Sequence, residues 1–175
     1  MSRQNLIFIG PTGAGKTTVG RRVAQQLGLD FLDLDQEIER CTGADIPLIF
    51  DIEGESGFRQ RETRALRDAC ARKGIALATG GGAVVAEENQ REMRRCGFVV
   101  YLSTPVERQL SRLCRDKRRP LLSKPNREEI LEHMARERNP IYESLADLIV
   151  PSEPVSVARM TQRVLASIRG SDYAI

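Results

Sequence analysis

Three glycines, a lysine and three threonines lie close together in the stretch GPTGAGKTT, and these residue types at this spacing suit phosphate chemistry. From Gly10 to Thr17 they match the phosphate-binding pattern G-x-x-x-x-G-K-[ST], known as the P-loop. Glycines let successive backbone N–H groups turn toward one anion, and the helix that follows adds the positive end of its dipole. Lys16 would meet the β- and γ-phosphates of a nucleotide, and the Thr17 hydroxyl would bind Mg²⁺. The alternative, a glycine-rich turn that merely joins strand to helix, is disfavoured because the full motif and its context agree.

A pair of carboxylates, Asp33 and Asp35 in the stretch FLDLD, is the second group that could do chemistry. Residues two apart in a strand point to the same face, so both carboxylates are expected to project together while Leu34 enters the core. They stand at the carboxyl end of a predicted strand, where open α/β sheets bind ligands. One would hold a metal through water, and the other would orient an attacking hydroxyl and accept its proton. The alternative stays open that Asp35 only caps the next helix and Asp33 is a surface charge.

These groups need elements to position them, and short apolar runs alternate with helical patterns along the chain. The apolar runs predict strands at residues 5–10, 30–35, 74–82, 96–104 and 147–150. Amphipathic patterns predict helices at 16–27, across roughly 36–73 with breaks near 42–43 and 54–57, at 127–146 and at 155–168. Pro140 is expected to kink or split the helix at 127–146. This alternation predicts an α/β fold with a parallel sheet covered on both faces.

The composition is that of one globular domain over residues 1–175. Hydrophobic residues make up 41%, charged residues 29%, and the net charge is only +3. Aromatic residues make up 5% and tryptophan is absent, so no nucleic-acid partner is expected. Four cysteines without a CxxC pair, and a single histidine, argue against a zinc site. The apolar run at 6–9 is too short for a signal peptide or a membrane span, so we expect a cytoplasmic protein with free thiols and no membrane partner.

Two classes of nucleotide-binding protein lack support in the sequence. A switch GTPase needs an N-K-x-D segment to recognise its base, and none is present. A motor or transporter ATPase usually carries an apolar run that ends in Asp, whereas the run at 75–79 ends in Gly80, Gly81 and Gly82. One glycine would satisfy a simple turn, so three in a row favour a backbone that closely approaches a substrate.

Seven motifs together resemble the shikimate kinases, small P-loop kinases related to the nucleoside monophosphate kinases. They occur in the order GPTGAGKTT, LDLDQEIE, TGADI, IFDIEGESGFRQRE, ATGGGAVV, RDKRRPLL and RNPIYE, and the resemblance extends from about Asn5 to Val150. It implies a three-layer P-loop NTPase fold with a five-stranded parallel sheet of order 2-3-1-4-5. It also implies Mg²⁺-dependent transfer of the γ-phosphate of ATP to the 3-hydroxyl of shikimate, giving shikimate 3-phosphate and ADP. This reaction belongs to the biosynthesis of chorismate and the aromatic amino acids.

The resemblance assigns substrate-binding roles to four residues. Asp35 would bind shikimate hydroxyls and serve as the base, and Gly81 would contact shikimate through its backbone. Arg59 and Arg138 would bind the shikimate carboxylate, which suits guanidinium groups because they offer a planar fork of donors. Without the resemblance, Arg59 would be interpreted as part of a solvated helix face, and Arg138 as the partner of a nearby glutamate.

The resemblance also implies how ATP is bound. Asp33 would hold Mg²⁺ through water, beside Thr17. Residues of about 112–124 would form a lid that closes over ATP and excludes water, and a helical region of about 36–73 would bind the substrate. Arg119, just before Pro120, would approach the phosphates or the adenine side of ATP, and Arg112 is a second candidate for this role. The implied catalytic residues are Lys16, Asp35 and Arg119, and the implied ATP contacts are Gly13, Ala14, Gly15, Lys16, Thr17, Thr18 and Arg119.

Two rival activities stay in view. Another small-molecule kinase of this fold, such as a gluconate kinase, would also need cations for a carboxylate. A non-catalytic ATP-binding module would have lost Lys16, Asp35 or an arginine, and all are present. The family resemblance implies a monomer. The segment GSDYAI at 170–175 matches no motif and is expected to be mobile.

Overall fold

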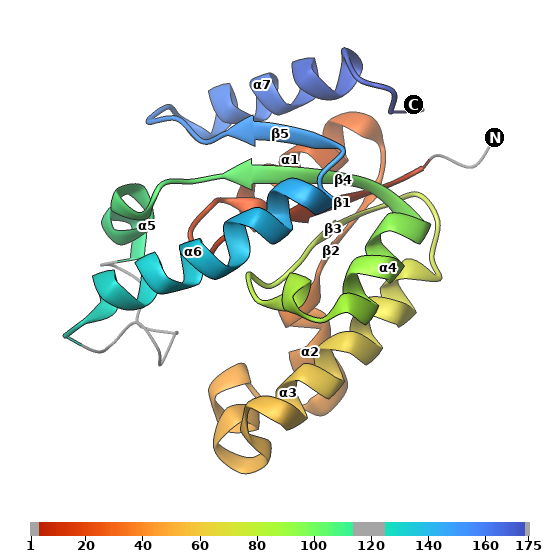
Figure 1. The fold of residues 1–175 in the computed structure, drawn as a ribbon. Coiled ribbons are helices and arrows are strands. Elements are labelled where there is room, and N and C mark those ends of the chain that lie inside the picture. The colour runs from red at the N-terminus through yellow and green to blue at the C-terminus, as the bar shows by residue number, and fades with distance from the viewer. Residues whose placement is uncertain (1–3, 114–124, 174–175) are drawn as a thin grey trace.

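The computed structural model describes residues 4–113 and 125–173, and its centre is a five-stranded parallel sheet (Figure 1). The strand order is β2-β3-β1-β4-β5, which confirms the predicted α/β class and the order 2-3-1-4-5. Because the strands are parallel, their carboxyl ends meet at one edge of the sheet. The strands are β1 (Asn5–Ile9), β2 (Asp30–Asp33), β3 (Ile75–Ala78), β4 (Gly97–Ser103) and β5 (Leu148–Pro151).

Helices cover both faces of the sheet (Figure 1). One face carries α1 (Lys16–Leu27) and α7 (Val157–Arg169), which pack against each other. The other face carries α2 (Leu34–Thr42), α3 (Ile46–Cys70), the short turn η1 (Ala83–Val85), α4 (Glu87–Cys96) and α6 (Arg127–Leu145). The remaining described helix, α5 (Val106–Leu113), contacts α6 through Leu113 and Leu131.

Alternation along β1 divides the core into two layers. Leu6 and Phe8 pack with α1 and α7, whereas Ile7 and Ile9 pack with the helices of the opposite face. Every residue of β1 is buried, because the strand has a neighbour on each side and helices above and below. This central position explains why its sequence is apolar without interruption from Leu6 to Ile9.

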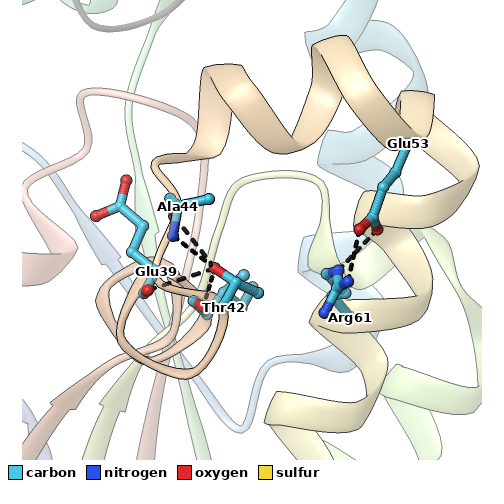
Figure 2. Close-up of polar contacts among 6 residues, drawn as sticks. Glu39, Thr42, Ala44, Glu53 and Arg61 are labelled. Carbon is cyan, nitrogen blue, oxygen red and sulfur yellow. Dashed lines mark hydrogen bonds and ion pairs between the residues drawn. The ribbon is translucent and has the colours of Figure 1, made fainter.

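The predicted break between α2 and α3 is present, and hydrogen bonds of one threonine organise it. Gly43 ends α2 with a left-handed backbone (φ 69°). The Thr42 hydroxyl donates to the carbonyl oxygen of Ile38 at 2.9 Å and accepts from the backbone N–H of Ala44 at 3.3 Å (Figure 2). Thr42 thus fixes the turn through which the chain enters α3.

The second predicted break lies inside α3, at Gly54. Its backbone angles are φ 71° and ψ −177°, a region that residues with a side chain essentially do not occupy. The two halves of α3 are joined across this break by an ion pair between Glu53 and Arg61, with Nη2 and Oε1 2.5 Å apart (Figure 2). The kink therefore changes the direction of the helix while the halves stay connected.

The strand FLDLD is shorter than predicted. β2 ends at Asp33, and Asp35 lies in the first turn of α2. The prediction that both carboxylates project from one strand face is therefore wrong. The alternative for Asp35 also fails, because Asp33 is the residue that caps α2, accepting from the backbone N–H of Gln36 at 3.2 Å. Leu34 is fully buried, as predicted.

Of the two outcomes expected at Pro140, the split does not occur, since α6 runs from Arg127 to Leu145 with Pro140 inside it.

The expectation that the segment at 170–175 is mobile is corrected for residues 170–173. They are anchored at Tyr173, which is buried edge-on against Phe98 with ring centroids 5.5 Å apart. Its hydroxyl donates to the backbone carbonyl of Gln4 at 2.6 Å.

Most of the predicted lid, residues 114–124, lies outside the described residues. Within residues 4–113 and 125–173, no helix is both long enough and apolar enough to span a lipid bilayer. Three of the cysteines, Cys41, Cys70 and Cys96, are in the described part and are free thiols.

We expect Asn5 to be essential to the junction between β1 and β3. Its buried side chain donates to the carbonyl of Arg72 at 2.8 Å and accepts from the N–H of Ile75 at 3.1 Å. Asn5→Leu leaves both backbone groups unpaired, so the free energy of unfolding should fall by about 2–4 kcal/mol in urea denaturation. Gln4→Leu is the control, because Gln4 is exposed. Equal stability of the two variants would contradict this role.

Candidate functional site

The phosphate-binding loop lies between β1 and α1, at the carboxyl edge of the sheet, and lines a cavity of about 480 Å³. Helix α1 begins at Lys16, so its first N–H groups, which have no partner inside a helix, lie at this loop. Residues from β2, α2 and the segment before α7 complete the wall. The lining includes Gly13, Ala14, Gly15, Lys16, Thr17, Thr18, Asp33, Asp35, Thr79, Arg112 and Val155.

A larger groove of about 900 Å³ lies between α1 and α7, and its lining includes Arg22, Gln25 and Arg159. It contains none of the residues that the sequence motifs single out. We therefore assign the site to the smaller cavity, where a phosphate-binding loop and carboxylates converge.

Lys16 is buried inside the loop. Its ammonium donates to the backbone carbonyls of Gly10 at 2.7 Å and of Pro11 at 2.8 Å. These bonds hold the positive charge at the position where the loop would receive phosphate oxygens.

Thr17 and Asp33 are brought together from α1 and the end of β2. The Thr17 hydroxyl donates to Oδ2 of Asp33 at 2.5 Å, and Oδ1 of Asp33 caps α2. The Asp33 side chain is therefore fixed at both oxygens. A hydroxyl and a carboxylate beside a phosphate site are hard oxygen donors, and Mg²⁺ prefers such ligands.

The glycine turn after β3 packs against two of the predicted substrate-binding side chains. A methyl group on Gly82 would lie 2.4 Å from Nη2 of Arg59, so no side chain fits there without displacing the guanidinium. A methyl group on Gly80 would lie 3.2 Å from Oδ1 of Asp35. The turn therefore places its backbone between the carboxylate and the guanidinium that the family resemblance assigns to shikimate.

The middle glycine connects this turn to the phosphate-binding loop. A methyl group on Gly81 would lie 3.3 Å from the backbone nitrogen of Thr12 and 3.6 Å from the carbonyl oxygen of Gly10. The predicted substrate side and the predicted phosphate side of the site are thus in direct contact through backbone.

Arg59 is oriented by a buried carboxylate. Its Nη1 lies 2.7 Å from Oε2 of Glu62, whose side chain is 1% exposed. Burial raises the pKa of the Glu62 carboxyl above its ordinary value; the positive charges of Arg59 and Arg138 oppose this rise, and the nearby Asp35 adds to it. The alternative interpretation of Arg59, as part of a solvated helix face, is therefore wrong, because its guanidinium binds a buried carboxylate.

Arg138 comes from α6 and faces the same cluster. Its positive charge acts on the hydroxyl of Tyr142 and on the carboxyl of Glu62, and it opposes the rise in the pKa of both groups. Among the described residues it forms no ion pair with a glutamate within 4.0 Å, which was the simpler interpretation of this arginine.

The structure brings together every predicted site residue that it describes, and it adds three. Arg119 lies outside the described residues. The additions are Glu62, Tyr142 and Thr12, which the sequence analysis did not single out. Glu62 lies three residues after Arg59 and Tyr142 four after Arg138, the spacing at which helix neighbours meet, so this spacing was an available signal.

Comparison with known proteins places these features in a family. The family model for shikimate kinase matches residues 12–169 of the chain. A shikimate kinase of Vibrio parahaemolyticus is 48% identical over 163 residues, which cover 93% of this chain and 95% of that protein. Shikimate kinase 1 of Sodalis glossinidius is 47% identical over 171 residues, which cover 97% of this chain and 98% of the relative.

Solved structures agree with the sequence comparison. A shikimate kinase from Acinetobacter baumannii, determined in complex with shikimate, superposes with a TM-score of 0.93 at 47% identity. The match covers 96% of this chain and 94% of the other. A sugar kinase from Janibacter, at 16% identity and a TM-score of 0.62, shares the fold alone. Because the family model matches most of the chain and relatives of 47–48% identity match nearly its full length, the chain belongs to the shikimate kinase family.

Proposed function

We propose that the residues around the glycine turn carry out the shikimate kinase reaction by direct in-line transfer from ATP to the 3-hydroxyl of shikimate. The observation that supports this most strongly is the position of the turn. Gly80–Gly82 contacts Asp35, Arg59 and the phosphate-binding loop at once, so an acceptor held by the first two would lie beside the γ-phosphate.

The loop from Gly13 to Thr18 is assigned to ATP. Its backbone N–H groups and the ammonium of Lys16 would bind the phosphates, and Arg119 would reach them from the lid. Thr17 and Asp33 would hold Mg²⁺, Asp33 through water, and this pair of oxygen donors fits an ion that keeps several waters. When bound, the ion would neutralise charge on the β- and γ-phosphates.

The other side of the turn is assigned to shikimate. Arg59 and Arg138 would clamp its carboxylate, while Asp35 and the backbone of Gly81 would bind its hydroxyls. Glu62 would hold the Arg59 fork in position before the substrate arrives, which lowers the cost of ordering it on binding.

In the transfer step, the 3-hydroxyl oxygen bonds to the γ-phosphorus and the bond to the bridging oxygen of ADP breaks. Asp35 accepts the hydroxyl proton, and Lys16 stabilises the negative charge that develops on the phosphate oxygens. No covalent intermediate with the enzyme is required. We further propose that the protein acts as a monomer, with residues of about 112–124 closing over ATP.

The substrate assignment is tested by ADP release from Mg·ATP with shikimate, with gluconate and without acceptor. Of these three conditions, only the one with shikimate should release ADP. Arg59→Ala should raise the KM for shikimate about 30-fold or more, because a charge-assisted carboxylate contact is lost, with ATP binding retained. Arg64→Ala is the matched control, an exposed arginine of the same helix. Turnover with gluconate alone would reject the acceptor, and ATP binding without turnover on either would indicate a non-catalytic module.

Asp35 is expected to act on kcat. Asp35→Asn keeps the shape of the side chain and removes the base, so kcat should fall by about 10²- to 10⁴-fold, with the KM for ATP nearly unchanged. Asp30→Asn, at the exposed start of β2, controls for the loss of one negative charge. If only the KM for shikimate rises, Asp35 positions the substrate and is not the base.

Glu62 should contribute more to the free energy of unfolding as pH falls. An exposed carboxylate in an ion pair has the opposite effect. Because its folded-state pKa is raised by burial, the folded protein takes up this proton before the unfolded chain does. The associated stability is complete below the ordinary carboxyl pKa and is lost as pH rises through the raised value. The melting temperature of the wild type minus that of Glu62→Gln should therefore increase as pH falls from about 8 to about 5. A difference that stays constant or shrinks as pH falls would contradict the raised pKa of Glu62.

A further inference from the structure

Tyr142 of α6 is a buried side chain to which the proposed reaction gives no role. It is 1% exposed, and its ring stacks on Tyr101 of β4 with centroids 5.0 Å apart and planes inclined by 27°. Its hydroxyl donates to the backbone carbonyl oxygen of Gly81 at 2.5 Å. A phenol from α6 is thus bonded to the middle residue of the glycine turn.

The positive charge of Arg138, one helical turn earlier in α6, acts on the same hydroxyl and opposes the rise in the pKa of the Tyr142 phenol. The phenol proton goes to Gly81, so this hydroxyl ties α6, the helix that carries Arg138, to the glycine turn. The turn and Arg138, which the proposed function assigns to shikimate, come from segments 57 residues apart in the sequence.

This bond also determines where the turn presents its donors. In a trans peptide the carbonyl and the next N–H point in opposite directions, so fixing the Gly81 carbonyl toward Tyr142 directs the Gly82 N–H away from it. Within residues 4–113 and 125–173, neither the Gly81 nor the Gly82 N–H is bonded to a protein acceptor. Of the two residues, Gly82 lies beside the Arg59 guanidinium and Gly81 lies beside Thr12.

We propose that Tyr142 is a positioning residue for shikimate, whose hydroxyl fixes the Gly81 turn against α6, the helix that carries Arg138. This inference rests on the proposed roles of Gly81 and Arg138. Burial raises the pKa of the Tyr142 phenol well above its ordinary value, so the donated proton is retained at every working pH. Without the hydroxyl, the Gly81 carbonyl would lose its hydrogen bond to α6, and the turn would no longer be fixed relative to that helix.

The test compares Tyr142→Phe with Tyr101→Phe. Both variants keep the stacked rings and lose one hydroxyl, but the Tyr101 hydroxyl makes only a long contact of 3.5 Å to Asn139 and does not reach the turn. We expect Tyr142→Phe to raise the KM for shikimate about tenfold, because binding is lost equally in the ground state and in the transition state. For the same reason kcat should stay within about threefold of wild type, and the KM for ATP within about twofold. Tyr101→Phe should leave all three constants within about twofold of wild type.

An unchanged KM for shikimate in Tyr142→Phe would overturn the proposal. So would an equal rise in both KM values together with a large loss of melting temperature, or failure of this variant alone to fold, since each indicates a structural role. The double variant with Arg138→Gln separates this proposal from the carboxylate clamp. If Tyr142 acts partly through Arg138, its effect on KM should shrink in the Arg138→Gln background.

Fully multiplicative effects would overturn the coupling to Arg138. If Arg138→Gln alone binds shikimate normally while Tyr142→Phe does not, the carboxylate clamp is wrong and Tyr142 acts through Gly81 alone.

Discussion

The parallel pairing of β1 between β3 and β4 is the constraint on which the site depends. It requires the segments after β1, β2 and β3 to leave the sheet at one edge. The phosphate-binding loop, Asp33 and the glycine turn are therefore neighbours although they are far apart in the sequence. β1 can hold this central place because both of its faces are apolar, and Asn5 supplies the hydrogen bonds that align its start with β3.

The charged groups of the site are organised before any ligand binds. Arg59 is paired with Glu62, and Asp33 is held by Thr17 and by the start of α2. Each of these bonds costs conformational freedom during folding and not during binding, which favours affinity. The cost is that polar groups are buried in the half of the core nearest the substrate side. One oxygen of Glu62, Oε1, has no hydrogen-bond partner in the described part of the chain.

The fold and the phosphate side of the site were predictable because they rest on local patterns. Apolar runs and the spacing from Gly10 to Thr17 carry that information within a few residues. The position of Asp35 was not predictable from alternation, because α2 begins at Leu34, two residues before the predicted helical region. Contacts such as Tyr142 with Gly81 are tertiary, so no local pattern contains them. Tyr173 is similar, since its packing on Phe98 and its hydrogen bond to Gln4 are tertiary contacts that anchor residues 170–173.

The contact between Tyr173 and Gln4 places the entry to β1 and the exit from α7 side by side, near the edge of the sheet opposite the ligands (Figure 1). The first and the last described residues therefore lie close together. A short linker could join these two points and new ends could be opened in a surface loop, giving a circular permutant whose site is assembled from the same contacts. The geometry also means that attachment to a surface through this corner would leave the substrate entrance unobstructed.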